Sequence, residues 1–208
     1  MESKIDYRDP KWVASRLGLD KNTVYRLLQD GNLPAIQIGR KWLISESRLA
    51  EYLAEEERLQ TVLRRMVPLP AAHRVEEQAR AEAASYRHAY IGQEHLLLAL
   101  TTVETRAKDA LAELQADETT VRSLFESQVA EGDKAPRAKP ELTPRARKAI
   151  CLAAEEAHRA GRVSYGPEHL LAGLLRTKEG MGFQMLASLG IDLDAVRAKM
   201  TPKQPRIC

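Results

Sequence analysis

The sequence predicts a mainly α-helical protein, and three observations support this fold class. Helix-forming residues such as Ala, Leu, Glu and Arg dominate the 208 residues, whereas aromatic residues make up only 5%. A nine-residue segment occurs twice in similar form, as GQEHLLLAL at 92–100 and as GPEHLLAGL at 166–174. No apolar run approaches the roughly 20 residues that a membrane span requires. These features favour a globular chain of helices, part of which is duplicated.

The N-terminus and the cysteines indicate a cytoplasmic protein. Glu2 and Asp6 stand near the N-terminus, and no apolar stretch of a signal peptide accompanies them. Cys151 and Cys208 lack the spacing of metal ligands, so we interpret both as reduced thiols. We therefore expect no membrane partner, no metal and no cofactor.

The first 30 residues predict a helix-turn-helix. Asp9 and Pro10 are typical of a helix start, and Gly18 ends this helix. Asp20 then caps a second helix at 21–29, and two short helices joined by a tight glycine turn form this motif. The side chains expected on the outward face of the second helix are Lys21, Asn22, Thr23, Tyr25 and Arg26. They can reach phosphates and base edges in a major groove, although an ordinary solvated helix face would have the same composition.

The next segment predicts a wing. In LPAIQIGRKWLIS, apolar residues alternate around Gly39-Arg40, which indicates a short β-hairpin with Arg40 and Lys41 at its tip. A basic hairpin after a helix-turn-helix can touch the DNA backbone or the minor groove. The net charge of +3 also belongs to this region, because residues 1–45 hold eight Lys/Arg against five Asp/Glu. This charge favours a polyanion as partner.

Residues 9–53 resemble the excisionase family of winged helix-turn-helix domains, which is related to the MerR type. The similarity lies in VASRLGLDKNTVYRLLQDGNLPAIQIGRKWLIS followed by LAEYL. It implies binding to double-stranded DNA. Asp20 and Asp30 lower the positive field, so one domain alone should bind weakly, and specific binding should need a dimer on a repeated site.

A long helix is expected at 46–66, with Ser45 as its cap. Its apolar stripe consists of Leu49, Leu53, Leu59, Leu63 and Met66. This stripe exceeds what the small winged domain should need, which suggests that part of it pairs two subunits in a homodimer. The prolines of VPLPAA end the helix. We therefore place the DNA-binding domain at 1–67 and a linker at 68–72.

The remainder of the chain is an internal repeat. The matching residues are Ala79, Glu82 and Ala83 with Ala153, Glu156 and Ala157, and then Leu111, Leu114, Asp117, Val121 and Arg122 with Leu186, Leu189, Asp192, Val196 and Arg197. Each copy should contain about four helices, and two like copies should pack as a pseudo-two-fold bundle. We expect a second domain at 73–200, with repeat one at 73–129, a linker at 130–141, repeat two at 142–200 and a tail at 201–208.

The repeat resembles the Clp N-terminal domain, the double four-helix module at the front of the Clp unfoldases. The residues that carry this similarity are YIGQEHLLLAL, ELTPRARKAICLAAEEAHRAG, YGPEHLLAGLL and MLASLGIDLDAVR. The first copy departs further from the family. Its opening helix lacks the Thr-x-Arg-Ala start, and Gln115 stands where the second copy has Gly190.

Glu94 and Glu168 are the candidate ligand-binding residues of this domain. Each falls in the first turn of a helix, where a carboxylate suits the helix dipole, so both could have a purely structural role beside His95 and His169. The resemblance implies a further role, because in Clp N-terminal domains these glutamates bind the guanidinium of phosphorylated arginine. A threonine 25 residues upstream assists them in the family.

Thr143 stands 25 residues before Glu168, whereas Leu69 stands 25 residues before Glu94. This spacing predicts that the second phosphoarginine site is intact and that the first is compromised. Clp N-terminal domains are also targets of cyclic peptide antibiotics, which bind an apolar groove with a basic edge. Leu142 and Arg147 could contribute to such a groove.

The motifs indicate a binding protein rather than an enzyme. The 208 residues contain no GxxxxGK[ST] phosphate loop, and the two Glu-His pairs lack the second histidine of a zinc-protease helix. The histidines also show no motif pairing with a nucleophile.

Together these features predict a bacterial transcription regulator, linked to protein quality control, stress response or antibiotic sensing. Its Clp-like module would sense a phosphoarginine protein, a Clp adaptor or a Clp-directed cyclic peptide antibiotic. An alternative is a Clp adaptor or decoy that sequesters Clp ligands. Recombination directionality, as in phage excisionases, leaves the larger part of the chain unexplained.

Overall fold

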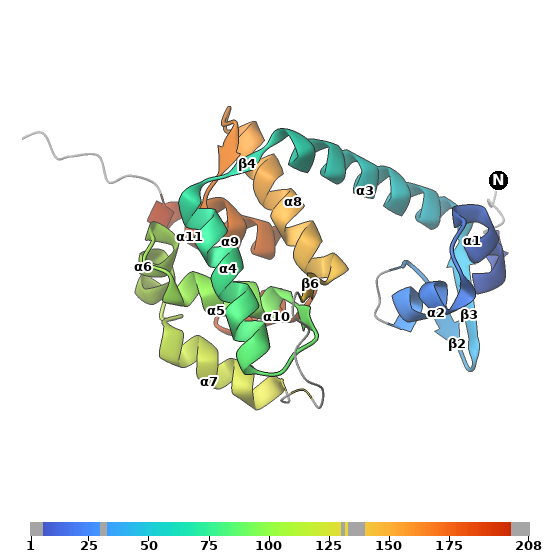
Figure 1. Ribbon diagram of the computed structural model, residues 1–208, viewed down its shortest axis with the longest axis horizontal. Coiled ribbons are helices and arrows are strands. Elements are labelled where there is room, and N and C mark those ends of the chain that lie inside the picture. The colour runs from blue at the N-terminus through green and yellow to red at the C-terminus, as the bar shows by residue number, and fades with distance from the viewer. Residues whose placement is uncertain (1–5, 30–32, 130–131, 133–139, 201–208) are drawn as a thin grey trace, which may run out of the picture. The chain divides into compact units, whose positions relative to one another are not determined.

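The structure is a computed structural model that describes residues 6–29, 33–129, 132 and 140–200. It divides into two compact units, Met1–Arg58 and Leu59–Cys208, each of which is considered by itself (Figure 1). The mainly α-helical fold class is confirmed. The strands among the described residues are short, with at most five residues.

The first unit is a helix-turn-helix with a small sheet. Its elements are β1 (Tyr7–Arg8), α1 (Pro10–Leu17), α2 (Lys21–Gln29), β2 (Ile36–Ile38), β3 (Lys41–Ser45) and the start of α3 (Glu46–Arg65). The three strands form an antiparallel sheet in the order β1-β3-β2. The hairpin β2–β3 was expected from the sequence. Strand β1 was not, because two residues are too few to show an alternating pattern.

The predicted helix ends are confirmed in this unit. The Trp12 backbone N–H donates to Asp9 Oδ1 at 2.7 Å, and the Thr23 N–H donates to Asp20 Oδ1 at 3.0 Å. Gly18 ends α1 with φ of +66°, a left-handed conformation that suits glycine. The buried side chains between the helices and the sheet are Val13, Ala14, Val24, Leu28, Leu33, Ile44 and Leu49.

Helix α3 contributes its apolar stripe to more than one core. Leu49 packs in the winged unit, whereas Leu59 packs with Cys151 and Leu152, and Met66 belongs to the large core of the second unit. Of the stripe, Leu53 remains 38% exposed. The stripe does exceed the needs of the winged unit, but the second unit of the same chain buries most of the excess. It is therefore not an argument for subunit pairing.

The second unit contains four helices from each copy, as the repeat predicts. The first copy forms α4 (Pro70–Ser85), α5 (Gln93–Thr102), α6 (Arg106–Glu113) and α7 (Glu118–Gln128); the second forms α8 (Pro144–Arg159), α9 (Pro167–Arg176), α10 (Met181–Ser188) and α11 (Leu193–Met200). Apolar residues of both copies share one core, so neither copy is an independent domain.

Two short parallel ladders join the copies. β4 (Val67–Pro68) pairs with β7 (Ser164–Tyr165), and β5 (Tyr90–Ile91) pairs with β6 (Glu141–Leu142). Each ladder connects the start of one copy to the loop in the middle of the other copy. The ladders are equivalent under the 74-residue offset with the copies exchanged, which is the relation expected of a pseudo-two-fold pair.

The domain boundaries differ from those expected. The division falls between Arg58 and Leu59 rather than at residue 67, because the C-terminal turns of α3 pack on the second unit. The expected linker 68–72 is part of β4 and α4, and its prolines stand in a strand and at the first helical position. Most of the expected linker 130–141 and the whole tail 201–208 lie outside the described residues.

Candidate nucleic-acid interface and ligand-binding sites

The expected DNA-reading face lies on α2. Lys21, Asn22, Tyr25 and Arg26 are exposed, while Val24 on the opposite side is fully buried. Thr23 differs from the others, since it is half-buried and its hydroxyl donates to Asp20 Oδ2. Its side chain is therefore part of the helix cap, and the remaining four side chains form the accessible face.

The wing (residues 36–45) presents its cations at the tip. Ile38 pairs with Lys41, so Gly39 and Arg40 form a two-residue turn. Gly39 has φ of +61°, as a type II′ hairpin turn requires at its first position. Arg40 and Lys41 are both exposed. The hairpin thus places two positive side chains where a phosphate backbone could meet them.

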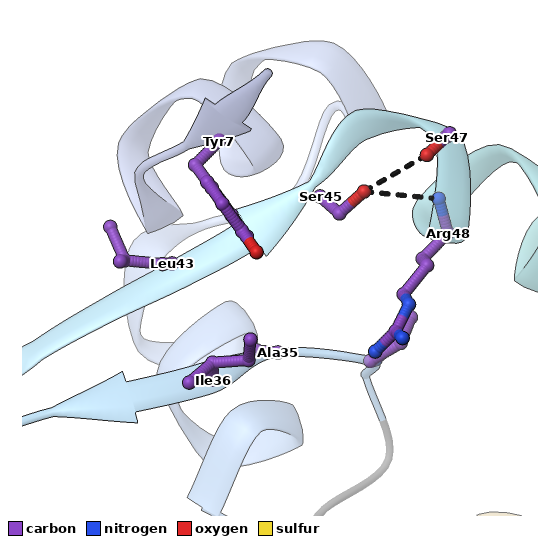
Figure 2. A pocket seen from close by; sticks show the side chains of 8 residues that line it. Tyr7, Ala35, Ile36, Leu43, Ser45, Ser47 and Arg48 are labelled. Carbon is purple, nitrogen blue, oxygen red and sulfur yellow. Dashed lines mark hydrogen bonds between the residues drawn. The ribbon is translucent and has the colours of Figure 1, made fainter. Parts of the chain in front are cut away.

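A shallow cavity of about 130 Å³ lies at the outer face of this sheet (Figure 2). Its lining consists of Tyr7, Pro34, Ala35, Ile36, Leu43, Ser45, Ser47 and Arg48. At its α3 side, Ser45 Oγ lies 3.0 Å from Ser47 Oγ and accepts from the Arg48 backbone N–H at 3.5 Å. Sequence reasoning missed this feature, because it depends on Tyr7 in the unpredicted strand β1.

Glu94 and Glu168 both lie in the first turn of a helix, α5 and α9 respectively. The N–H of Gly92 donates to His95 Nδ1 at 2.9 Å, and the N–H of Gly166 donates to its counterpart His169 at 3.0 Å. The histidines therefore have the local hydrogen-bonding role that the sequence permits, and each occupies the place of a capping-box Glu or Gln. The glutamates are left for other interactions.

The two glutamates differ in exposure and in charge. The Glu168 side chain is 41% exposed, and the His169 imidazole, 3.2 Å away, lowers the pKa of this carboxyl. Arg106 of α6 lowers it further. The Glu94 side chain is only 19% exposed, and burial raises its pKa. Glu168 is thus the accessible anion of the pair, whereas Glu94 is penalised as a charge.

A buried histidine pair accounts for part of this difference. His95 Nδ1 accepts from Gly92, so the proton of the neutral ring lies on Nε2, which donates to His88 Nδ1 at 2.7 Å. His95 is 1% exposed, and burial together with His88 lowers its pKa to about 3. Phe125 packs 5.7 Å from the His95 ring centre. In the second copy, the position of His88 is taken by Arg162, which is exposed.

The structure does not bring Thr143 and Glu168 together. The Thr143 N–H donates to the carbonyl of Ile91 at 2.9 Å, so this threonine lies beside the loop that leads to Glu94. The 16 residues of α8, about 24 Å of helix, separate Thr143 from the loop that leads to Glu168. Leu69 takes the corresponding place there, because its N–H donates to the carbonyl of Tyr165 at 2.8 Å.

Two candidate sites follow, and each combines both copies. The Glu94 site contains Glu94, His95 and Thr143; the Glu168 site contains Glu168, His169 and Leu69. The predicted pairing of Thr143 with Glu168 relied on distance along the chain, whereas the ladders exchange the helix starts between the copies. Nothing in the spacing distinguishes the two arrangements.

The other predicted residues lie at the start of α8. The Thr143 hydroxyl accepts from the Ala146 N–H at 3.2 Å, which confirms its role as a helix cap. Leu142 is half-buried against the core, and Arg147 is exposed. Both therefore belong to the same end of α8 as Thr143, towards the loop of the Glu94 site.

Other kinds of site were sought within the described ranges. No group of three or more His, Cys, Asp or Glu side chains there could hold a metal ion. Likewise, none of the helices in that part of the chain is long and apolar enough to cross a membrane.

Comparison with known families assigns both units. Residues 9–57 match the family described as helix-turn-helix domain, and residues 70–150 and 141–206 match the Clp repeat (R) N-terminal domain. The two matches to the latter agree with the internal repeat. Both families are binding domains rather than catalytic ones.

The relatives are long proteins of which the chain covers a small part. It is 34% identical over 130 residues to "Chaperone protein ClpB" of Oceanobacillus iheyensis and 35% identical over 130 residues to "Negative regulator of genetic competence ClpC/MecB" of Bacillus subtilis. Each match spans 62% of this chain and 16% of the relative.

Solved structures agree on the fold. The N-terminal domain of the chaperone ClpD from Arabidopsis thaliana superposes with a TM-score of 0.51 at 19% identity, over 66% of this chain and 93% of that one. The Hsp104 N-terminal domain from Candida albicans gives a TM-score of 0.51 at 14% identity, over 64% and 88%. At such identities the likeness concerns the fold alone.

Proposed function

Since the chain belongs to the family of Clp repeat N-terminal domains and carries a helix-turn-helix domain ahead of that region, we propose that it is a bacterial transcription regulator that binds DNA and senses a ligand of Clp N-terminal domains. The observation that carries this proposal is the combination within one chain. A DNA-reading module precedes a peptide-binding type of module, and the 208 residues hold no phosphate loop for ATP-driven unfolding.

The winged unit supports the DNA part of the proposal. Arg26 on α2 and the two cations of the wing tip are exposed on elements that such domains place against DNA. Phosphate contacts would supply most of the affinity, and Asn22 and Arg26 can hydrogen-bond base edges. The small number of such contacts favours binding of two or more copies to a repeated site.

The Glu168 site supports the sensing part. Its carboxylate is accessible and has a lowered pKa, so it can accept charge-assisted hydrogen bonds from a guanidinium. We propose that a phosphoarginine-bearing protein is the ligand. A Clp adaptor or a cyclic peptide antibiotic, bound near Leu142 and Arg147, is the second possibility.

Genome-wide DNA crosslinking of the tagged protein in its host tests this function. A regulator gives discrete peaks at promoters, and these peaks change when arginine phosphorylation is induced. A Clp adaptor or decoy gives no such peaks and instead co-purifies with Clp components. The second result would contradict the proposal.

A further inference from the structure

Ile38 is an exposed apolar side chain that the core of the winged unit does not use. The register of the hairpin pairs Ile38 with Lys41 and Ile36 with Leu43, and directly paired residues project from the same face of a sheet. Ile44 projects from the opposite face and is fully buried. Ile38 therefore points away from the core, and it is 63% exposed.

The position of Ile38 distinguishes it from an ordinary exposed residue. Single apolar residues on a surface are common and need no explanation. Ile38, however, directly precedes the turn of the wing, where Arg40 follows two residues later and Lys41 stands opposite. An apolar side chain held between two cations at the end of a hairpin would reach DNA together with them.

We propose that Ile38 is an apolar wedge, which packs against the sugars and a base step of the DNA minor groove while Arg40 and Lys41 contact the flanking phosphates. The inference rests on the DNA binding proposed above and names a contact within it. Apolar side chains inserted between base steps unstack and kink the duplex. Because pyrimidine–purine steps unstack most easily, Ile38 would favour sites with a TA step without any hydrogen bond to a base.

The test compares Ile38→Ala with Ile36→Ala in the full chain. Ile36 is the matched control, since it lies on the same strand and face, is also exposed, and stands about 7 Å further from the tip. The probes are two duplexes of about 25 base pairs, one with central TA steps and one with AA steps in their place. Fluorescence anisotropy is measured over a series of salt concentrations.

We expect Ile38→Ala to weaken binding to the TA duplex by about 5- to 30-fold and to the AA duplex by less. The slope of log affinity against log salt should not change, since no phosphate contact is lost. Ile36→Ala should stay within about twofold of the wild type. Arg40→Ala should flatten the salt slope by about 1.

Three results would overturn the wedge, and they separate it from the proposed function. Wild-type affinity in Ile38→Ala, with a flattened slope in Arg40→Ala, removes the wedge and leaves DNA binding intact. Equal losses in the two isoleucine variants, with altered self-association in light scattering, assign this face to a second copy instead. No DNA binding by the wild type at low salt removes both the wedge and the regulator.

Discussion

The two copies of the nonapeptide have the same fold but differ in their chemistry. In both, a glycine precedes the helix, a histidine hydrogen-bonds back to it, and a glutamate lies between them. Around Glu94 the surroundings are closed by His88, His95 and Phe125, and burial raises the pKa of the carboxyl. Around Glu168 they are open, and His169 lowers it. The difference shows that a conserved motif within one chain can keep its structural role in both copies and its binding role in one.

The largest expected effect concerns stability in acid. His95 has a pKa of about 3 in the folded chain against 6.5 for an unperturbed histidine, so the unfolded state binds a proton that the folded state does not. Its contribution to stability is complete above pH 6.5 and is lost as the pH falls from 6.5 towards 3, by about 1.4 kcal/mol per pH unit. Urea unfolding at a series of pH values measures this slope.

The matched variants are His95→Gln and His169→Gln, since Gln keeps the bond to the helix start. The first should remove this part of the slope, and the second should leave it. Glu94 has a raised pKa and opposes the slope near pH 4.5, but it is present in both variants and cancels. An equal slope in the two variants would mean that the copies are buried alike.

A smaller effect is expected on phosphoarginine binding. Glu168→Gln should weaken it by about 10- to 100-fold, because a charge-assisted hydrogen bond to a guanidinium is lost. Glu94→Gln should change it by less than about threefold, since the buried carboxyl is a poor anion. Isothermal titration calorimetry with free phosphoarginine gives both values, and circular dichroism checks the helices. Equal losses would contradict the inequality of the sites.

The smallest expected effect distinguishes the structure from the spacing rule. Thr143→Asn retains a side-chain oxygen to cap α8 but removes the hydroxyl. If Glu168 is the binding residue, this variant should bind phosphoarginine within about twofold of the wild type. A loss as large as that of Glu168→Gln would place the threonine beside Glu168 after all.

Much of the fold could be predicted from the sequence, because its signals are local. Asp9, Gly18 and Asp20 mark helix ends through hydrogen bonds to residues three or four positions away. The repeat likewise predicted four helices in each copy. Strand β1 and the burial of Leu59 by α8 depend on contacts between distant residues, and no pattern in the sequence reveals them.

The candidate sites were predictable in part. Glu94 and Glu168 are found from the nonapeptides, and Thr143 from its capping position. Which threonine or leucine faces which glutamate depends on the exchange of helix starts between the copies. The charge of each carboxyl depends in the same way on neighbours such as His88, whose place Arg162 takes in the other copy.

The most direct measurement is an NMR titration of the Glu94 and Glu168 carboxyl carbons in the full chain. The structure predicts that Glu168 titrates below the unperturbed pKa of 4.5 and that Glu94 titrates above it. Glu94→Gln and Glu168→Gln assign the two resonances. The same pKa for both carboxyls, or the reverse order, would contradict the account that one copy keeps an accessible anion for a guanidinium ligand while the other has buried it.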